Sequence, residues 1–201
     1  PIVVVNVQRG GPSTGLPTKT EQSDLMQALY GRNGESPSVV LASSTPGNCF
    51  DWAYMASKIT LEHNTPVVLL SDGYLGNGAV TWKIKSTKDM PEINPSIAVE
   101  GEEYQPYARD EKTLARKIAL PGTKGLEHRL GGLEKEDITG NVSYDPDNHE
   151  KRVGIRSEKI KLIAYVIPDQ QVLGTEEGDL LVIGWGGTHG SLDSAAQNLL
   201  A

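Results

Sequence analysis

Cysteine is almost absent from this sequence. Cys49 is the only cysteine among 201 residues, so the chain cannot close an internal disulfide or supply the thiolates of a Cys-rich zinc site or an iron–sulfur cluster. Long apolar runs are missing too, because no stretch approaches the roughly 20 apolar residues of a membrane span. The N-terminus lacks the basic and then apolar pattern of a signal peptide. These absences predict a cytoplasmic protein without a membrane partner.

Basic residues are in the minority. The chain has 19 Lys and Arg against 26 Asp and Glu, a net charge of −7, so it lacks the basic surface that a nucleic-acid partner requires. Apolar residues make up 37% of the chain, which is low but above the range of disordered chains. A chain of this length can bury a sizeable core. We therefore expect an ordered protein that does not bind nucleic acid.

The two ends of the chain indicate part of a longer protein. No initiator Met precedes Pro1, and a strand-like run begins at residue 2. At the other end, residues 195–201 have a helical pattern without a Gly or Pro stop signal. We expect a fragment or partial chain.

Residues 1–84 alternate between short β-branched runs and amphipathic stretches, the pattern of an α/β domain with a parallel sheet. The run Ile2-Val3-Val4-Val5 is apolar throughout, as in strands that are buried on both faces. Short connections imply right-handed crossovers. We expect strands at residues 2–7, 39–41 and 67–70, and helices at residues 23–30 and 48–63.

Residues 85–177 form a long connection in this interpretation. Pro, Gly and mixed charges dominate residues 85–156, so we expect an irregular segment, followed by a helix at residues 157–167 that ends at Pro168. A loop of this length in a compact protein is usually functional or wraps a partner. Apolar and aromatic residues suited to anchoring it are Tyr104, Tyr107, Leu114, Ile118, Leu120, Leu126, Leu130 and Leu133.

Residues 178–201 resemble the first unit of a second α/β domain. We expect a fourth strand at residues 179–184, a turn through Gly184-Trp185-Gly186-Gly187 and a helix that begins near Ser191. The expected domain boundaries are therefore 1–84, 85–177 and 178–201.

The segment Arg9-Gly10-Gly11-Pro12-Ser13-Thr14 has the composition of an anion site. It follows the first expected strand, and open α/β sheets bind ligands at the carboxyl ends of their strands. Glycine lets the backbone approach an anion, and the hydroxyls of Ser13 and Thr14 can donate hydrogen bonds to it. Arg9 supplies a planar fork for a carboxylate or phosphate. The segment is neither a Walker loop nor a dinucleotide fingerprint.

Other polar residues have ordinary structural explanations. Asp72-Gly73 and Ser43-Ser44-Thr45 follow the other two strands and either line the same site or cap helices, and capping is the stronger interpretation. Cys49 suits a small buried position, and His128 is more typical of a structural residue than of a ligand. The sequence contains no Ser-His-Asp set, no pair of catalytic carboxylates and no metal motif. We therefore assign no catalytic or metal-binding residue, and the cofactor-binding residues stay open.

These motifs resemble the α subunit of 2-oxoacid:ferredoxin oxidoreductases, in particular the 2-oxoglutarate branch. The resemblance is carried by residues 7–18, 22–28, 31–35, 66–78, 125–149 and 178–190. It implies an incomplete pyrimidine-binding domain of the thiamine-diphosphate type, followed by the start of a transketolase-C-terminal-like domain. It also implies that Arg9 binds the carboxylate of the substrate, with Gly10, Gly11, Ser13 and Thr14 shaping the site.

The activity implied by this resemblance is oxidative decarboxylation of a 2-oxoacid, with 2-oxoglutarate as the expected substrate. The acyl group passes to coenzyme A and the electrons to ferredoxin. Thiamine diphosphate is shared with a β subunit, which carries magnesium and an iron–sulfur cluster. The family's activating glutamate and its Tyr-Pro-Ile-Thr-Pro loop lie upstream of the Arg9 motif and are missing here, so we expect this chain to be inactive by itself.

Two other functions stay open at this point. The chain is a non-catalytic anion-binding or subunit-assembly module if no upstream glutamate exists. Alternatively, it belongs to an oxidoreductase for pyruvate or branched-chain 2-oxoacids, because part of the substrate pocket is absent.

Overall fold

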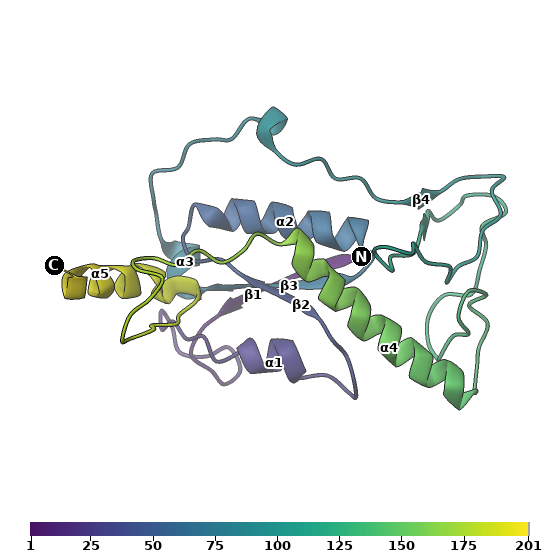
Figure 1. Cartoon of the computed structure of the whole chain (residues 1–201), viewed down its shortest axis with the longest axis horizontal. Coiled ribbons are helices and arrows are strands. Elements are labelled where there is room, and N and C mark those ends of the chain that lie inside the picture. Colours follow the sequence, from purple (N-terminus) through teal and green to yellow (C-terminus); the bar gives the residue numbers. More distant parts are fainter. Residues whose placement is uncertain (201) are drawn as a thin grey trace.

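A three-stranded parallel sheet lies at the centre of the chain (Figure 1). In this computed structural model, which describes residues 1–200, the sheet order is β1-β3-β2. The strands are β1 (Ile2–Gln8), β2 (Val39–Ala42) and β3 (Pro66–Asp72). Both pairings are parallel, and α1 (Leu25–Tyr30) and α2 (Asn48–Glu62) connect the strands. The predicted α/β class and these five elements are confirmed.

The central strand β3 separates two apolar cores. Side chains alternate along a strand, so Val67 and Leu69 face one core and Val68 and Leu70 the other. Helix α2 covers the first face and α1 the opposite face (Figure 1). The first core joins β2, β3 and α2 to Ile163, far along the chain.

The first strand is much more exposed than its sequence predicts. Ile2 is 59% exposed, Val5 57% and Val7 54%. The reason is strand order, because β1 lies at an edge of the described sheet and β3, not β1, takes the central position. The expectation that the first strand is buried on both faces was therefore wrong; β3 is the strand that is buried on both faces.

The long segment after β3 is ordered and lies against helices of its own chain. After α3 (Gly73–Asn77), residues 78–96 run outside α2 and include η1 (Thr87–Asp89) (Figure 1). Tyr54 Oη of α2 donates a hydrogen bond to Pro91 O at 2.6 Å, and Lys58 Nζ donates to Glu92 O at 2.5 Å. Two short strands, β4 (Ile97–Ala98) and β5 (Ile118–Ala119), then pair in parallel.

Only some of the predicted anchors are buried. Leu126 is buried, and the ring of Tyr107 contacts Arg116 and Arg152, whose guanidinium carbons are 4.3 and 4.4 Å from the ring centroid. In contrast, Leu120, Leu130 and Leu133 are exposed. Residues 85–144 are therefore held more by polar and cation–π contacts than by apolar burial.

Helix α4 (Pro146–Ile163) begins eleven residues before the predicted helix start. Asp145 caps it by accepting a hydrogen bond from Asp147 N at 3.1 Å, and Pro146 occupies the first turn, where its missing N–H costs nothing. The prediction missed this start because the first turns are almost entirely polar. A 3₁₀ turn, η2 (Ala164–Val166), continues the helix, in agreement with the predicted end before Pro168.

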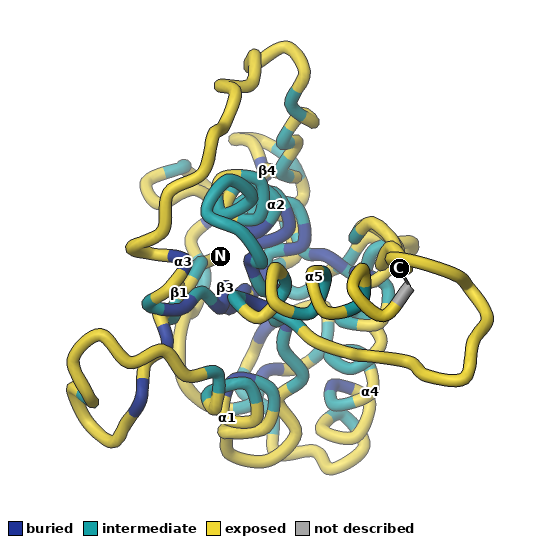
Figure 2. The backbone as a smooth tube through the Cα atoms, turned by 90° about the vertical axis from the view of Figure 1, so that its left-hand side faces the viewer, coloured by how far each residue is buried: buried dark blue, intermediate teal, exposed yellow. Residues whose placement is uncertain are grey.

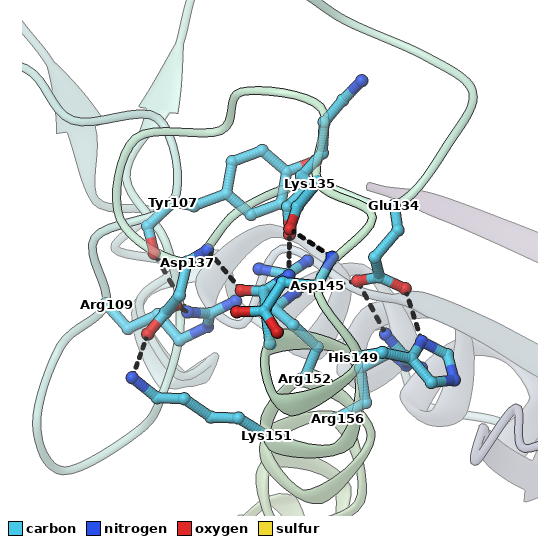
Figure 3. Close-up of polar contacts among 12 residues, drawn as sticks. Tyr107, Arg109, Glu134, Lys135, Asp137, Asp145, His149, Lys151, Arg152 and Arg156 are labelled. Carbon is cyan, nitrogen blue, oxygen red and sulfur yellow. Dashed lines mark hydrogen bonds and ion pairs between the residues drawn. The ribbon is translucent and has the colours of Figure 1, made fainter.

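Charged side chains fasten the connecting segment to α4 (Figure 3). Asp137 pairs with Arg109 and with Lys151 Nζ at 2.8 Å. Burial raises the pKa of Asp137, but the hydrogen bonds from Lys151 and Arg109 outweigh burial and hold the pKa below its usual value. Glu134 in turn lies 3.0 Å from His149 Nδ1 and 3.4 Å from Arg152 Nε.

Lys159 connects α4 to the end of α2. Its Nζ donates hydrogen bonds to His63 O at 3.1 Å and to Asn64 O at 3.2 Å. Burial lowers the pKa of Lys159 to about 8, and the nearby guanidinium groups of Arg116 and Arg109 lower it further in the same direction. The C-terminal end of α2 favours a cation here, whereas the positive charges of the nearby arginines disfavour the protonated amine of Lys159.

The predicted fourth strand does not form. Residues 179–184 pair with no strand among the described residues, and residues 180–183 are exposed (Figure 2). An extended segment becomes a strand only when a neighbour satisfies its backbone groups, and none lies beside it. The following turn η3 (Gly186–Thr188) and helix α5 (His189–Leu200) confirm the predicted turn and helix. Within residues 1–200, no helix is long and apolar enough to cross a membrane.

Candidate functional site

The ends of the three strands meet at one edge of the sheet. All three strands are parallel, so the segments after Gln8, Ala42 and Asp72 leave from the same edge. This is the edge at which α/β sheets bind ligands. The residues predicted for the anion site therefore lie where the topology places a ligand.

The loop after β1, residues 9–19, is closed by its own backbone. Gly10 N donates a hydrogen bond to Lys19 O at 2.8 Å, and Leu16 N donates to Gly10 O at 2.7 Å. Inside the loop, Gly15 N donates to Pro12 O at 3.0 Å. These bonds give the loop a defined shape and leave the side chains of Arg9, Ser13 and Thr14 to solvent.

Glycine is required at position 15. Its φ of +71° is in the left-handed region, and a Cβ there would clash with Gly10 O. The same Cβ would lie 3.4 Å from Arg9 Cγ, so the backbone at residue 15 passes beside the stem of Arg9. Gly15 thus allows the loop to fold back against the side chain of Arg9.

The guanidinium of Arg9 has no acidic partner in the described part of the chain. None of the ion pairs among residues 1–200 includes Arg9, and its side chain is exposed. A guanidinium has five N–H donors in a planar fork that matches a carboxylate. Arg9 is therefore available for an external anion.

Asp72 has the structural role that the capping interpretation predicted. It is 1% exposed, and its Oδ1 accepts hydrogen bonds from Tyr74 N and Leu75 N, both at 2.9 Å. The other oxygen, Oδ2, accepts from Gly187 N at 3.0 Å and from Gln22 Nε2 at 3.5 Å. The four groups that donate hydrogen bonds to Asp72 all belong to this chain, so Asp72 organises the edge.

Sequence reasoning did not single out Gln8, Asn6 and Asp24. Gln8, 2% exposed, accepts a hydrogen bond from Asp24 N at 3.2 Å and donates to Ser71 O at 3.2 Å. Asn6 Nδ2 donates to Asp24 Oδ2 at 3.0 Å. These hydrogen bonds connect Asp24, which follows the loop, to strand β1, which precedes it. The available signal was the presence of two amides inside an apolar strand.

The hydroxyl residues after β2 act as caps. Asn48 Oδ1 accepts hydrogen bonds from Ser44 N and Thr45 N, both at 3.0 Å, and Asn48 N donates to Thr45 Oγ1 at 3.2 Å. Cys49 Sγ donates to Thr45 O at 3.4 Å and is half-buried rather than fully buried. Ser43, in contrast, is fully buried, and its hydroxyl has no hydrogen-bond partner among the described residues.

His128 contacts residues of its own segment. Its Nδ1 is 2.8 Å from Leu126 O, and its ring meets Tyr104 edge-on with centroids 5.4 Å apart. Both rings line a hollow of about 370 Å³, and burial raises the pKa of Tyr104. The structure keeps His128 in the structural role expected of it.

Within the described residues, no three His, Cys, Asp or Glu side chains gather in a group that could hold a metal ion. Asp72, the fully buried carboxylate at the sheet edge, is already occupied by hydrogen bonds. A diphosphate bound through magnesium requires oxygen ligands for that ion. Among the described residues the loop of residues 9–19 offers donors suited to a small anion, and no cluster of carboxylate or histidine ligands for that ion is present.

Comparison with protein families decides the relationship. Residues 1–144 match the family described as pyruvate flavodoxin/ferredoxin oxidoreductase, thiamine diphosphate-binding.

The chain belongs to this family.

Individual relatives agree with this membership. The chain is 52% identical over 198 residues to the 2-oxoglutarate oxidoreductase subunit KorA of Mycobacterium tuberculosis, covering 98% of this chain and 30% of that protein. It is 30% identical over 197 residues to the 2-oxoglutarate synthase subunit KorA of Methanothermobacter marburgensis, covering 98% of this chain and 52% of that protein. The predicted resemblance to the α-subunit family, with its 2-oxoglutarate branch, is confirmed.

A solved structure has the same fold. The 2-oxoglutarate:ferredoxin oxidoreductase from Magnetococcus marinus, with 2-oxoglutarate, coenzyme A and succinyl-CoA bound, superposes with a TM-score of 0.86 at 35% identity. The match covers 98% of this chain and 34% of that chain. The chain thus spans about a third of the solved relative, and between 30% and 52% of the two curated relatives described above.

Proposed function

We propose that this chain forms part of the α subunit of a thiamine-diphosphate-dependent 2-oxoacid:ferredoxin oxidoreductase with 2-oxoglutarate as substrate. The reaction is oxidative decarboxylation to the acyl-coenzyme A, with reduction of ferredoxin. The observation that carries this proposal is the unpaired Arg9 guanidinium on a closed loop at the carboxyl edge of the sheet. The names of the relatives support the choice of substrate.

In this proposal Arg9 binds a carboxylate of the substrate. The two oxygens of a carboxylate match two N–H groups of the guanidinium, which holds the substrate in one orientation as well as attracting it. Gly10 and Gly11 allow close approach of the backbone, and Ser13 and Thr14 offer hydroxyl donors on the same loop. Orienting the substrate is itself a contribution to catalysis.

Thiamine diphosphate, when bound, supplies the stabilisation of carbanions that decarboxylation requires. We assign its magnesium and diphosphate, together with an iron–sulfur cluster, to a separate β subunit, in keeping with the family resemblance; the single cysteine of this chain cannot hold a cluster. Ferredoxin, coenzyme A and this β subunit are the proposed partners, and the cytoplasm is the proposed location.

The proposed domain organisation follows the sequence boundaries. Residues 1–84 belong to a pyrimidine-binding domain, residues 85–177 connect it, and residues 178–201 begin a transketolase-C-terminal-like domain. The helix that follows the Gly186-Gly187 turn supports the last assignment.

The test is substitution of Arg9 in the assembled oxidoreductase. For Arg9→Ala we expect kcat/KM for 2-oxoglutarate to fall about 10- to 100-fold, because a hydrogen bond to a charged group contributes about 1.5–3 kcal/mol. Arg9→Lys keeps the charge without the planar fork and should recover part of this loss. Coupled ferredoxin reduction with 2-oxoglutarate, pyruvate and a branched-chain 2-oxoacid measures both activity and substrate preference.

The matched control is Arg32→Ala. Arg32 is also an exposed arginine in a glycine-containing loop, but it follows α1 and leads into β2, so it lies at the opposite edge of the sheet. We expect an unchanged kcat/KM for this variant. Equal activity of Arg9→Ala and wild type would overturn the substrate-binding role, and would favour the assembly-module alternative.

A further inference from the structure

The carboxylate of Asp72 divides its hydrogen bonds between two tasks. Oδ1 accepts from Tyr74 N and Leu75 N, which begin α3 directly after the strand. Oδ2 accepts from Gly187 N and Gln22 Nε2, which come from segments 115 and 50 residues away in sequence. One oxygen therefore serves an ordinary helix cap, and the other joins three separate parts of the chain.

Gln22 is the second member of this junction. Its Nε2 donates to Trp185 O at 3.0 Å as well as to Asp72 Oδ2. Gln22 lies three residues beyond Lys19, whose carbonyl closes the loop of residues 9–19. The exit of that loop is thereby tied both to the end of β3 and to the turn that contains Trp185.

The turn of residues 185–187 fits closely against this pair. A Cβ at position 186 would clash with Gln22 Nε2, and one at position 187 would lie 2.5 Å from Asp72 Oδ2. Trp185 adds apolar contact, because it packs against the core that contains Leu70. Glycine at both positions is therefore what allows the backbone to reach Asp72.

The first residues of the loop are held at the same edge of the sheet, close to Asp72. Gln8, the residue before Arg9, lies opposite Asp72 in the β1–β3 ladder. The strand thus fixes where Arg9 starts, and the Asp72–Gln22 junction fixes where the loop returns. A loop that is held at both ends loses less freedom when a ligand binds.

We propose that Asp72 and Gln22 are positioning residues for the substrate loop. They hold residues 9–19 in the shape that presents the Arg9 guanidinium to a 2-oxoacid carboxylate, and they tie the start of α5 to that shape. Neither side chain touches substrate. This inference rests on the proposed function, because it assumes that the Arg9 loop binds the 2-oxoacid.

Asp72→Asn separates the two tasks of the carboxylate. The remaining amide oxygen can still accept from Tyr74 N and Leu75 N, whereas the new NH₂ group faces two other donors, Gly187 N and Gln22 Nε2. Gln22→Ala breaks the junction from the other side and leaves the cap of α3 intact. In the assembled oxidoreductase we expect both variants to raise KM for 2-oxoglutarate about tenfold, with kcat and the KM for coenzyme A within about twofold of wild type.

A matched control is Asp145→Asn, the same exchange at the cap of α4, which has no contact with the loop. We expect its KM values to equal those of wild type. Amide hydrogen exchange adds a readout that does not depend on turnover: residues 10–24 should exchange faster in Asp72→Asn and Gln22→Ala, but not in Asp145→Asn.

Two outcomes would overturn the proposal. One is an unchanged KM for 2-oxoglutarate and unchanged exchange in both variants. The other is a fall in kcat together with a rise in the KM for both 2-oxoglutarate and coenzyme A, which indicates general structural damage. Arg9→Ala distinguishes failure of the positioning role from failure of the proposed function. If Arg9→Ala lowers kcat/KM while Asp72→Asn and Gln22→Ala leave KM unchanged, only the positioning role fails. If Arg9→Ala has no effect, the proposed function itself fails.

Discussion

Residues 1–77 are held together mainly by apolar packing on both faces of β3, whereas residues 105–156 are held mainly by paired charges. In the first region, Leu70 and Val67 are fully buried among other aliphatic side chains. In the second, buried Arg152 lies against Tyr107 and near Glu134. Apolar burial does not depend on pH, while charged networks do. The core of the sheet can therefore stay packed under acidic conditions that loosen the connecting segment.

Truncation in the sheet core should have the largest effect on stability. Leu70→Ala removes a fully buried side chain, so we expect the free energy of unfolding to fall by about 2–5 kcal/mol. Leu130→Ala, at a position that is 76% exposed, should change it by less than about 0.5 kcal/mol. Urea unfolding of both variants measures the difference. Equal losses would contradict the assignment of the core to β3.

Removal of one charge from the connecting segment should cost less. Asp137→Ala leaves Arg109 and Lys151 without their shared carboxylate, and we expect a loss of about 1.5–3 kcal/mol in the free energy of unfolding. Since the pKa of Asp137 is lowered in the folded chain, its contribution is present above the ordinary carboxyl pKa and disappears as the pH falls through the folded value.

The exposed Asp169→Ala is the control for this variant. Unfolding at neutral pH and again near pH 3 should show a difference between Asp137→Ala and wild type that shrinks in acid. A difference that is independent of pH would mean that the ion pairs do not fasten this segment.

The smallest effect concerns Lys159. Its folded pKa of about 8 is below the model-peptide value of 10.5, so between these two values the unfolded chain binds more protons at this position. Stability should therefore rise with pH in that window, by at most about 1.4 kcal/mol per pH unit, because the two states differ by at most one proton at this position. Lys159→Met should lack this part of the rise, which parallel unfolding curves at pH 7.5 and 9.5 would measure. Identical slopes would contradict burial of the charged amine.

The two regions also differ in how far their structure was predictable. The five elements of residues 1–72 were predicted because apolar periodicity is strong there and turns are marked by Gly and Pro. Helix α4 was predicted only in its second half, since its early turns carry few apolar residues and are stabilised by contacts with Asp137 and Glu134. The prediction of a strand at residues 179–184 was wrong because strand propensity alone does not provide a partner strand.

The candidate site shows the same division. Arg9 and its glycines were found from composition and from their place after a strand. Gln8, Gln22 and Gly187 were not, because each acts through a partner that is distant in sequence. No local pattern distinguishes an amide that bridges two segments from one that faces solvent.

Local sequence patterns are sufficient to specify the strands and helices of residues 1–72, and they place a guanidinium and flexible glycines directly after the first strand. These are local properties, set by side-chain periodicity and backbone freedom over a few residues. Only the tertiary structure decided that β3 is central and β1 exposed, and that Asp72 joins the loop exit to the turn at Gly187. The reason is physical: strand order and long-range hydrogen bonds depend on which distant segments pack together.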